Sequence, residues 1–319
     1  MNIGEKNNRA GILGFVGRTP LVELKRVVPC GHAKVFVKLE SQNPTGSMKD
    51  RMALSVIDRA IESGRLRPSG TVVEYTGGST GTSLAFVCAA RGYAVTVVTS
   101  DAFSQEKRDH MRALGANVFE IESECGRTTK KLIRTMIEKA EELSSFPDAF
   151  LADQFNNSDA AAGYAPLANE VWEELNGEVD AFVQSVGTAQ CISGITAVLR
   201  KRNPEIEIIA VEPAESPVLS GGVPGPHKIE GIGPGFIPPL WTSDIADDIQ
   251  LVSTDDAKNM TRRLAREEAL FAGTSSGANV LAALQVAKRL GPGKMVVTLL
   301  CDSGLKYLST DLYVPGLAS

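Results

Sequence analysis

The sequence predicts an α/β fold with two open parallel-sheet domains that carry helices on both faces. Short segments in which every second residue is apolar alternate with segments in which apolar residues recur every three or four positions. The alternation runs through both halves of the 319-residue chain, a length that suits two domains. Because a helix between successive strands is typical of parallel sheets, we expect strands that are buried on both sides.

The first half of the chain predicts strands and helices in regular alternation. Residues 34–40 alternate with period two and predict a strand. From Met52 onward apolar residues recur every four positions, which predicts a helix that ends before Gly64 and Pro68. The same reasoning predicts strands at 71–75, 94–99, 117–122 and 149–153, and helices at 79–92, 104–115 and about 126–145.

The second half repeats this pattern. It predicts strands at 180–186, 206–213 and 294–300, and helices at 193–202, 255–271 and 277–291. Residues 216–239 are rich in glycine and proline and fit neither pattern. A loop of this length is longer than a simple connection between two elements, so we expect it to have a function.

Composition and charge exclude several classes of protein. A formal net charge of −5 provides no basic surface for nucleic acid or acidic membranes. The five cysteines and three histidines lack the spacing of a zinc site, and an odd number of cysteines argues against a disulfide framework. No signal peptide and no bilayer-spanning apolar stretch is evident. We therefore expect a soluble cytoplasmic protein without a metal site, a nucleic-acid partner or a membrane partner.

Four turns rich in glycine, serine and threonine each precede a predicted helix. In open α/β sheets ligands bind at the carboxyl ends of strands, so such turns can meet in one cleft. Small residues at the start of a helix leave backbone N–H groups free for an anion. The hydroxyls of Thr76, Ser79 and Thr80 suit a carboxylate, whereas the third turn suits a phosphate. The turns are NPTGSMK (43–49), TGGSTG (76–81), GTAQCISG (187–194) and GTSSGA (273–278).

Other catalytic motifs can be set aside. GTSSG (273–277) has the form of an esterase nucleophile elbow, but that fold needs a histidine after the serine, and none follows His227. GIGPG (231–235) is not a dinucleotide fingerprint, because no strand precedes it directly and prolines interrupt the helix it should open. A phosphate-binding GxxxxGK[ST] motif is absent, which argues against a nucleoside triphosphatase.

Four segments, in this order, resemble the cysteine synthase (O-acetylserine sulfhydrylase) branch of the fold-type II pyridoxal-phosphate enzymes, whose fold is like that of tryptophan synthase β. The resemblance extends from GRTPLVEL (17–24) to the last predicted strand. The part PGPHKIEGIGPGFIP (224–238) is specific to the cysteine synthase side of the superfamily. The four segments are NPTGSMKDR, TGGSTG, VEPAESPVLSGGVPGPHKIEGIGPGFIP (211–238) and GTSSGA.

The resemblance implies that pyridoxal 5′-phosphate is the cofactor and that Lys49 forms a Schiff base with it and then removes the substrate's α-proton. A lysine beside a helix N-terminus and out of bulk water has its charged form disfavoured, which suits this role. The implied reaction is a β-replacement, in which an O-activated serine gives an aminoacrylate and sulfide or another nucleophile adds to it. The product is L-cysteine or a related amino acid.

The resemblance also implies roles for the other turns. Ser275 faces the pyridine nitrogen, and Ser79 stands where the family has an asparagine that contacts the cofactor's 3′-oxygen. The cofactor phosphate is assigned to Gly187, Thr188, Ala189, Gln190 and Cys191. The substrate carboxylate is assigned to Thr76, Gly77, Gly78, Thr80 and Gln154.

The same turns depart from the family pattern. Gly77 and Ser79 replace a serine and an asparagine, which predicts more room beside the substrate carboxylate and a looser hold on the cofactor ring. Residues 189–191 replace Gly-Gly-Thr, so side chains must fit where glycines allow close approach or positive φ. We therefore expect a β-substituent that is bulkier than that of O-acetylserine or differently charged. Changing both residues back, Gly77→Ser with Ser79→Asn, is expected to favour acetylserine and sulfide.

Two alternatives stay open. One is a β-elimination lyase or dehydratase that releases an α-keto acid and ammonia from cysteine or serine. The other is a low-turnover cofactor-binding paralogue that acts as a regulatory partner. The resemblance further implies a smaller mobile domain at 45–152, a larger domain made of 1–44 and 153–319, an active site in the cleft between them, and a homodimer. A serine acetyltransferase is the kind of partner that the resemblance suggests.

Overall fold

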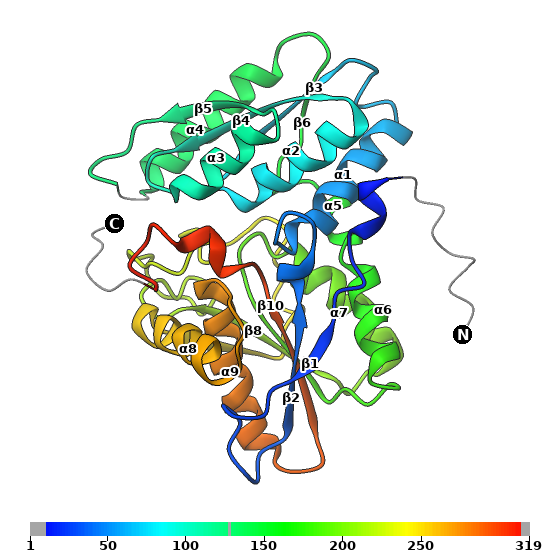
Figure 1. Cartoon of the computed structure of the whole chain (residues 1–319), viewed down its shortest axis with the longest axis vertical. Helices are drawn as coiled ribbons and strands as arrows, with labels where there is room; N and C mark the ends of the chain where they lie inside the picture. Colours follow the sequence, from blue (N-terminus) through cyan, green and yellow to red (C-terminus); the bar gives the residue numbers. More distant parts are fainter. Residues whose placement is uncertain (1–10, 127–128, 314–319) are drawn as a thin grey trace.

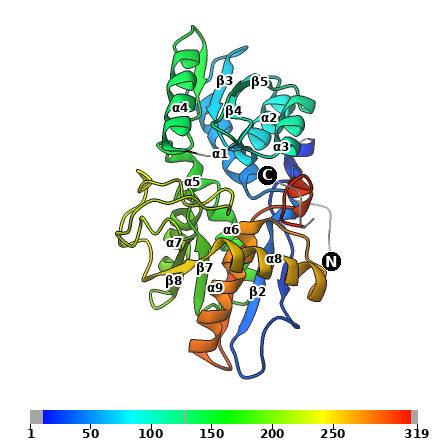
Figure 2. The same ribbon diagram turned by 90° about the vertical axis from the view of Figure 1, so that its left-hand side faces the viewer.

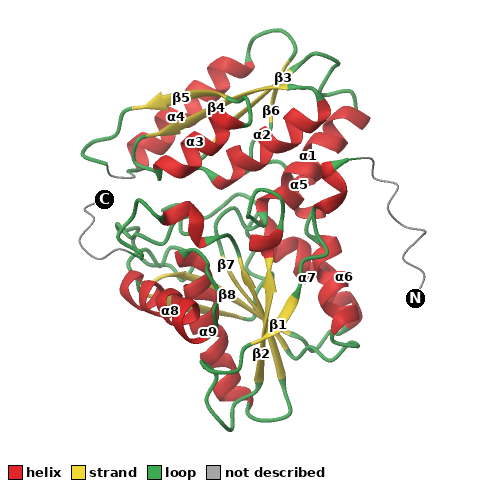
Figure 3. Ribbon diagram, viewed as in Figure 1, coloured by secondary structure: helices red, strands yellow, loops and turns green. Residues whose placement is uncertain are grey.

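The computed structural model describes residues 11–126 and 129–313 and has two lobes, each built on one sheet (Figure 1). Helices enclose both sheets (Figure 3), so the predicted α/β fold class is confirmed. No helix in the described part of the chain is long and apolar enough to cross a membrane.

The larger sheet contains six strands of the described chain, in the order β1-β2-β10-β7-β8-β9. Neighbouring strands are parallel, except that β1 pairs antiparallel with β2. Helices α6 and α7 lie on one side of this sheet, and α8 and α9 lie on the other (Figure 1). Every residue of the central strand β7 is buried, as expected for a parallel strand covered on both faces. The bounds are β1 Leu21–Glu23, β2 Lys34–Leu39, β7 Ala181–Ser185, β8 Glu207–Pro213, β9 Asp248–Val252, β10 Met295–Leu300, α6 Ala165–Glu174, α7 Gln190–Arg202, α8 Thr254–Glu267 and α9 Thr274–Leu290.

The smaller sheet contains four strands of the described residues, all parallel, in the order β5-β4-β3-β6. Helix α4 lies on one face, and α1, α2 and α3 lie on the other (Figure 2). A short helix, α5, connects this lobe back to the larger one. The bounds are α1 Lys49–Glu62, β3 Thr71–Tyr75, α2 Ser79–Arg91, β4 Ala94–Ser100, α3 Gln105–Ala113, β5 Asn117–Ile121, α4 Lys130–Ser144, β6 Ala149–Leu151 and α5 Asp159–Ala162. Three 3₁₀ turns complete the described elements: η1 Ile12–Phe15, η2 Glu40–Gln42 and η3 Gly304–Tyr307.

Several helix ends differ from the prediction for local reasons. Helix α8 ends at Glu267 instead of 271, because Ala269 has a left-handed φ of 57°. Helix α4 begins at Lys130 instead of about 126, where the Thr129 hydroxyl caps it by accepting the N–H of Leu132 at 3.1 Å. Strands β1 and β9 and helices α5 and α6 were not predicted.

Candidate active site

Lys49 is the first residue of α1 and lies at the carboxyl end of β10. The turn before it is tied to that strand end, because the Met48 N–H donates to the Cys301 carbonyl at 2.8 Å and Ser47 forms a β-bridge with Asp302. The Lys49 side chain is half-buried. Within residues 11–126 and 129–313, its Nζ has no hydrogen-bond or ion-pair partner. The structure therefore presents an amine at a helix start that is available for chemistry.

Asp50 fixes the first turn of α1 from the side of the smaller lobe. Its buried carboxylate accepts the Thr45 N–H at 2.8 Å, the Thr45 hydroxyl at 2.5 Å and the Ser83 hydroxyl at 2.6 Å. Burial raises the pKa of Asp50, and these hydrogen bonds offset part of that rise. The contacts hold the backbone next to Lys49 in place.

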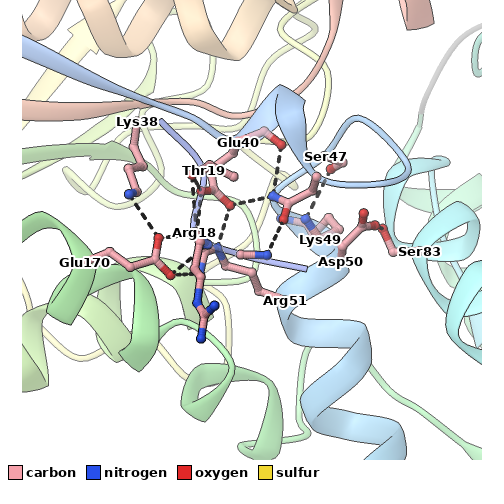
Figure 4. Close-up of polar contacts among 12 residues, drawn as sticks. Arg18, Thr19, Lys38, Glu40, Ser47, Lys49, Asp50, Arg51, Ser83 and Glu170 are labelled. Carbon is pink, nitrogen blue, oxygen red and sulfur yellow. Dashed lines mark hydrogen bonds and ion pairs between the residues drawn. The ribbon is translucent and has the colours of Figure 1, made fainter. Parts of the chain in front are cut away.

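Arg51 fixes the same turn from the side of the larger lobe (Figure 4). Its guanidinium donates to both Glu40 oxygens, at 2.7 and 2.9 Å, and to both Glu170 oxygens, at 2.7 and 2.8 Å. Lys38 also pairs with Glu170 at 3.0 Å. Because Glu40 lies in η2 and Glu170 in α6, this network joins α1 to the larger lobe.

The TGGSTG turn connects β3 to α2 and brings two of the predicted substrate residues together. The Thr76 hydroxyl accepts the Gly78 N–H at 3.0 Å and so shapes the turn. Backbone N–H groups in the first turn of α2 have no intrahelical partner and are available to an anion. The Thr80 hydroxyl donates to Gln154 Oε1 at 2.8 Å, and Gln154 Nε2 donates to the Tyr75 carbonyl at 2.6 Å. Gln154 therefore already has a fixed orientation beside this turn.

Gly77 and Gly78 of this turn are covered by side chains from the chain around the start of α3. A Cβ atom on Gly77 would lie 2.8 Å from Cε1 of Phe103. A Cβ atom on Gly78, whose φ is +139°, would lie 2.4 Å from Cδ of Lys107. The expectation that Gly77 leaves free space beside the substrate carboxylate is therefore wrong on the side where a side chain would stand, because the Phe103 ring fills it.

Gly77→Ser is expected to destabilise the protein by about 1–3 kcal/mol, because the new side chain overlaps the Phe103 ring. The double change Gly77→Ser with Phe103→Ala removes that overlap and is expected to lose less than the sum of the two single changes. Urea unfolding of the two single variants and the double variant measures this coupling. A Gly77→Ser protein as stable as the original would contradict the prediction.

The predicted phosphate turn approaches the irregular loop of residues 216–239 closely. A Cβ atom on Gly187 would lie 2.3 Å from the carbonyl oxygen of Gly231, so only glycine fits there. Ala189 has φ 66° and ψ −12°, which confirms that a non-glycine residue occupies a left-handed position at the start of α7. Backbone N–H groups of the first turn of α7 lack intrahelical partners, as an anion site requires.

Gln190 points back toward the segment that carries Gln154. Its side chain is buried, and its Nε2 donates to the carbonyls of Gln154 at 2.7 Å and Asn157 at 3.0 Å. The side chain that replaces a glycine of the family pattern therefore links the predicted phosphate turn to the segment of a predicted substrate residue. The amide oxygen of Gln190 also stays at the turn, where it accepts the Thr188 hydroxyl at 3.4 Å.

Two buried thiols, Cys191 and Cys301, lie within electrostatic range of Lys49, and Ser275 lies beside Cys301. Ser275 is the second residue of α9 and is buried, and its hydroxyl lowers the pKa of the Cys301 thiol. Burial raises the pKa of both Cys191 and Cys301, and the positive charge of Lys49 offsets part of that rise. Lys49, the start of α7 and the start of α9 therefore surround the end of β10.

Asp302 is the polar centre of this cluster. It accepts the Tyr307 hydroxyl at 2.7 Å and lies 3.4 Å from the Ser79 hydroxyl, both through Oδ2. Burial raises the pKa of Asp302, and the charges of Lys107 and Lys306 offset part of that rise. Sequence patterns did not indicate Lys107, Lys306 or Phe103, because the packing of α3 and η3 brings them to the site.

All four predicted turns meet at the carboxyl end of β10, where they combine an unpaired amine, two helix starts with free backbone N–H groups and a buried hydroxyl.

Residues 12–302 match the family model described as "Pyridoxal-phosphate dependent enzyme". The chain is 45% identical to a cysteine synthase of Staphylococcus aureus (strain Mu50), over 95% of this chain and 96% of that protein. It is 42% identical to a probable cysteine synthase of Bacillus subtilis (strain 168), over 95% and 97%. A crystal structure of cysteine synthase from Entamoeba histolytica matches with a TM-score of 0.90 at 37% identity, over 98% of this chain and 93% of that one.

Proposed function

Because this chain belongs to the pyridoxal-phosphate dependent enzymes, and because the relatives described above are cysteine synthases, we propose that it makes L-cysteine from O-acetyl-L-serine and sulfide by β-replacement. The observation that carries the proposal is the meeting of Lys49, the TGGSTG turn and the phosphate turn around the end of β10. The proposal is supported because an amine, a turn suited to a carboxylate and a turn suited to a phosphate lie around one strand end.

The residues present fit pyridoxal phosphate. The phosphate suits the first turn of α7, where Gly187 allows close backbone approach and Thr188 adds a hydroxyl. The ring nitrogen suits the Ser275 hydroxyl, which is neutral, and the aldehyde suits Lys49. When bound, the cofactor withdraws electrons from the substrate's α-carbon.

Within this proposal, the chain's own groups bind and orient the substrate and move one proton. The N–H groups at the start of α2, with Thr80 and Gln154 beside them, hold the substrate carboxylate. Lys49 Nζ would accept the α-proton of the bound substrate, and the contacts of Asp50 and Arg51 hold the backbone beside it in place. We further propose that residues 45–152 close on the rest of the chain when the carboxylate binds, which excludes water from the reacting carbon.

The proposal is tested with the purified protein loaded with pyridoxal phosphate. Incubation with O-acetyl-L-serine and sulfide is expected to yield L-cysteine and acetate in equal amounts. The competing lyase activity is measured in parallel as keto acid and ammonia released from L-cysteine or L-serine. If keto acid forms faster than cysteine, the protein is an elimination enzyme, and if neither product forms, it is a cofactor-binding protein without this activity.

A homodimer is also part of the proposal, and sedimentation as a monomer would refute that part.

A further inference from the structure

The side chain of Gln190, at the start of α7, contacts both the predicted phosphate turn and the chain between β6 and α5. Its Nε2 donates to the carbonyls of Gln154 at 2.7 Å and Asn157 at 3.0 Å. Its Oε1 accepts the Thr188 hydroxyl of the phosphate turn at 3.4 Å. Gln190 is 2% exposed, and these contacts fix the orientation of its amide.

The segment that Gln190 contacts has no regular structure to hold it. Residues 152–158, between β6 and α5, are in neither a helix nor a strand. Among the described residues, Gln190 Nε2 is the one hydrogen-bond donor to the Gln154 carbonyl. From the smaller lobe, Glu74 of β3 accepts the Gln154 N–H at 3.2 Å. The backbone of Gln154 is thus held at its N–H by the smaller lobe and at its carbonyl by the larger one.

The side chain of Gln154 keeps one N–H for a ligand at the TGGSTG turn. Its Oε1 accepts the Thr80 hydroxyl at 2.8 Å, and its Nε2 donates to the Tyr75 carbonyl at 2.6 Å. An amide nitrogen carries two N–H groups, so one remains beside the first turn of α2. The place of this N–H depends on the Gln154 backbone, and that backbone depends on Gln190.

We propose that Gln190 is a positioning residue for the substrate carboxylate, because it holds the Gln154 carbonyl and so fixes the remaining Gln154 N–H at the TGGSTG turn. The inference rests on the proposed function, since it requires an amino-acid substrate at this site. A glycine at position 190, as in the family pattern, has no side chain to make the contact. The residue that departs from the pattern therefore connects the phosphate turn to the carboxylate turn.

The test measures how much the carboxylate of a ligand contributes to its binding. The ligands are L-alanine and ethylamine, because they differ only in the carboxylate and neither carries a leaving group. Each is titrated into the cofactor-loaded protein in a calorimeter, and the ratio of the two Kd values gives the contribution of the carboxylate. We expect the original protein to bind L-alanine more tightly than ethylamine.

Two variants remove the donor of Gln190. Gln190→Met keeps the length of the side chain and is expected to raise the Kd of L-alanine about 10-fold, the loss of one well-placed hydrogen bond, while the Kd of ethylamine stays within about 2-fold. Gln190→Glu keeps the shape, cannot donate when ionised, and is expected to show the same selective loss. Urea unfolding shows which variants are folded, and either one suffices for the comparison.

Asn203→Ala is the matched control. Asn203 follows the last residue of α7, and its Nδ2 donates to the Val179 carbonyl at 3.3 Å. The change therefore removes the same kind of contact from the opposite end of the same helix. It is expected to leave both Kd values as they are.

A double variant shows whether Gln190 acts through Gln154. Gln154→Met removes the amide that we assign to the carboxylate. In that background Gln190→Met is expected to cause no further loss of L-alanine affinity, because the N–H that it positions is absent. The KM for O-acetyl-L-serine is expected to follow the Kd of L-alanine in all four proteins, whereas the KM for sulfide is not.

Each other outcome decides against the inference. It is wrong if the Gln190 variants weaken both ligands equally or neither of them, if the original protein binds L-alanine no more tightly than ethylamine, or if the two single losses add in the double variant. In those cases formation of L-cysteine by the original protein leaves the proposed function standing. If L-cysteine is not formed from O-acetyl-L-serine and sulfide, the proposed function itself fails, whatever the L-alanine titrations show.

Discussion

Replacing Lys49 by alanine is expected to abolish covalent attachment of pyridoxal phosphate and to lower kcat by at least about 10³-fold. The change removes both the amine that holds the cofactor and the base that accepts the α-proton, and such a base alone contributes about 10²–10⁴-fold. The position supports this, because Lys49 Nζ has no protein partner in the part of the chain that the structure describes.

The measurement is borohydride reduction of the cofactor-loaded protein, followed by identification of the labelled peptide. Lys306 is the rival, because burial lowers the pKa of its amine and its Nζ also has no hydrogen-bond partner among the described residues. Its side chain, however, packs on the turn that precedes α1, with Cε 3.7 Å from the Cβ position of Gly46. We expect label on Lys49 alone, and Lys306→Met is expected to keep the label. Label on a peptide without Lys49 would refute the assignment.

The sequence predicted the strands and helices whose burial is regular. Strand β7 is apolar or small at nearly every position and is buried throughout, so its pattern was readable. Strand β1 has only three residues, all half-buried, and β9 leaves Leu251 exposed, so neither carries a clear pattern. Helix α6 does carry a signal, since Leu167, Ala168 and Val171 are buried and proline stands in its first turn, a favoured position.

The candidate site could be predicted from the sequence where its residues form a local motif, but not where its contacts depend on packing between distant elements. Lys49, Ser275 and the four turns follow from residues that are neighbours in the chain, and the structure brings these turns to one strand end. The close approach of Phe103 to Gly77 has no local signal, since it depends on how α3 packs on the turn. The prediction of free space there was wrong for this reason. A glycine in the sequence does not indicate which neighbouring side chain occupies the space beside it.

Arg51→Met is expected to lower the free energy of unfolding by about 3–5 kcal/mol, the loss typical of breaking a buried ion pair. Glu40 is fully buried and would keep a charge without a cation, while Glu170 would keep its ion pair with Lys38 and its hydrogen bond from the Arg18 N–H. Denaturant unfolding measures the loss. Arg263→Met is the matched control, because Arg263 makes the same two-bond contact with Glu267 on an exposed helix face, where a pair contributes about 0.3–0.5 kcal/mol.

A double variant, Glu40→Gln with Arg51→Met, separates the effect of charge from the effect of packing. If the loss comes from an unpaired buried carboxylate, the neutral amide restores part of the stability, although it removes another charged group. If the loss comes from the guanidinium's packing alone, the double variant is no more stable than Arg51→Met, and the electrostatic explanation is wrong.

Because Arg51 is two residues from Lys49 and joins α1 to the larger lobe, Arg51→Met is also expected to make the position of Lys49 less fixed. A lower yield of borohydride label at Lys49, measured under conditions where the variant is folded, would connect the ion pair to the position of the proposed catalytic amine.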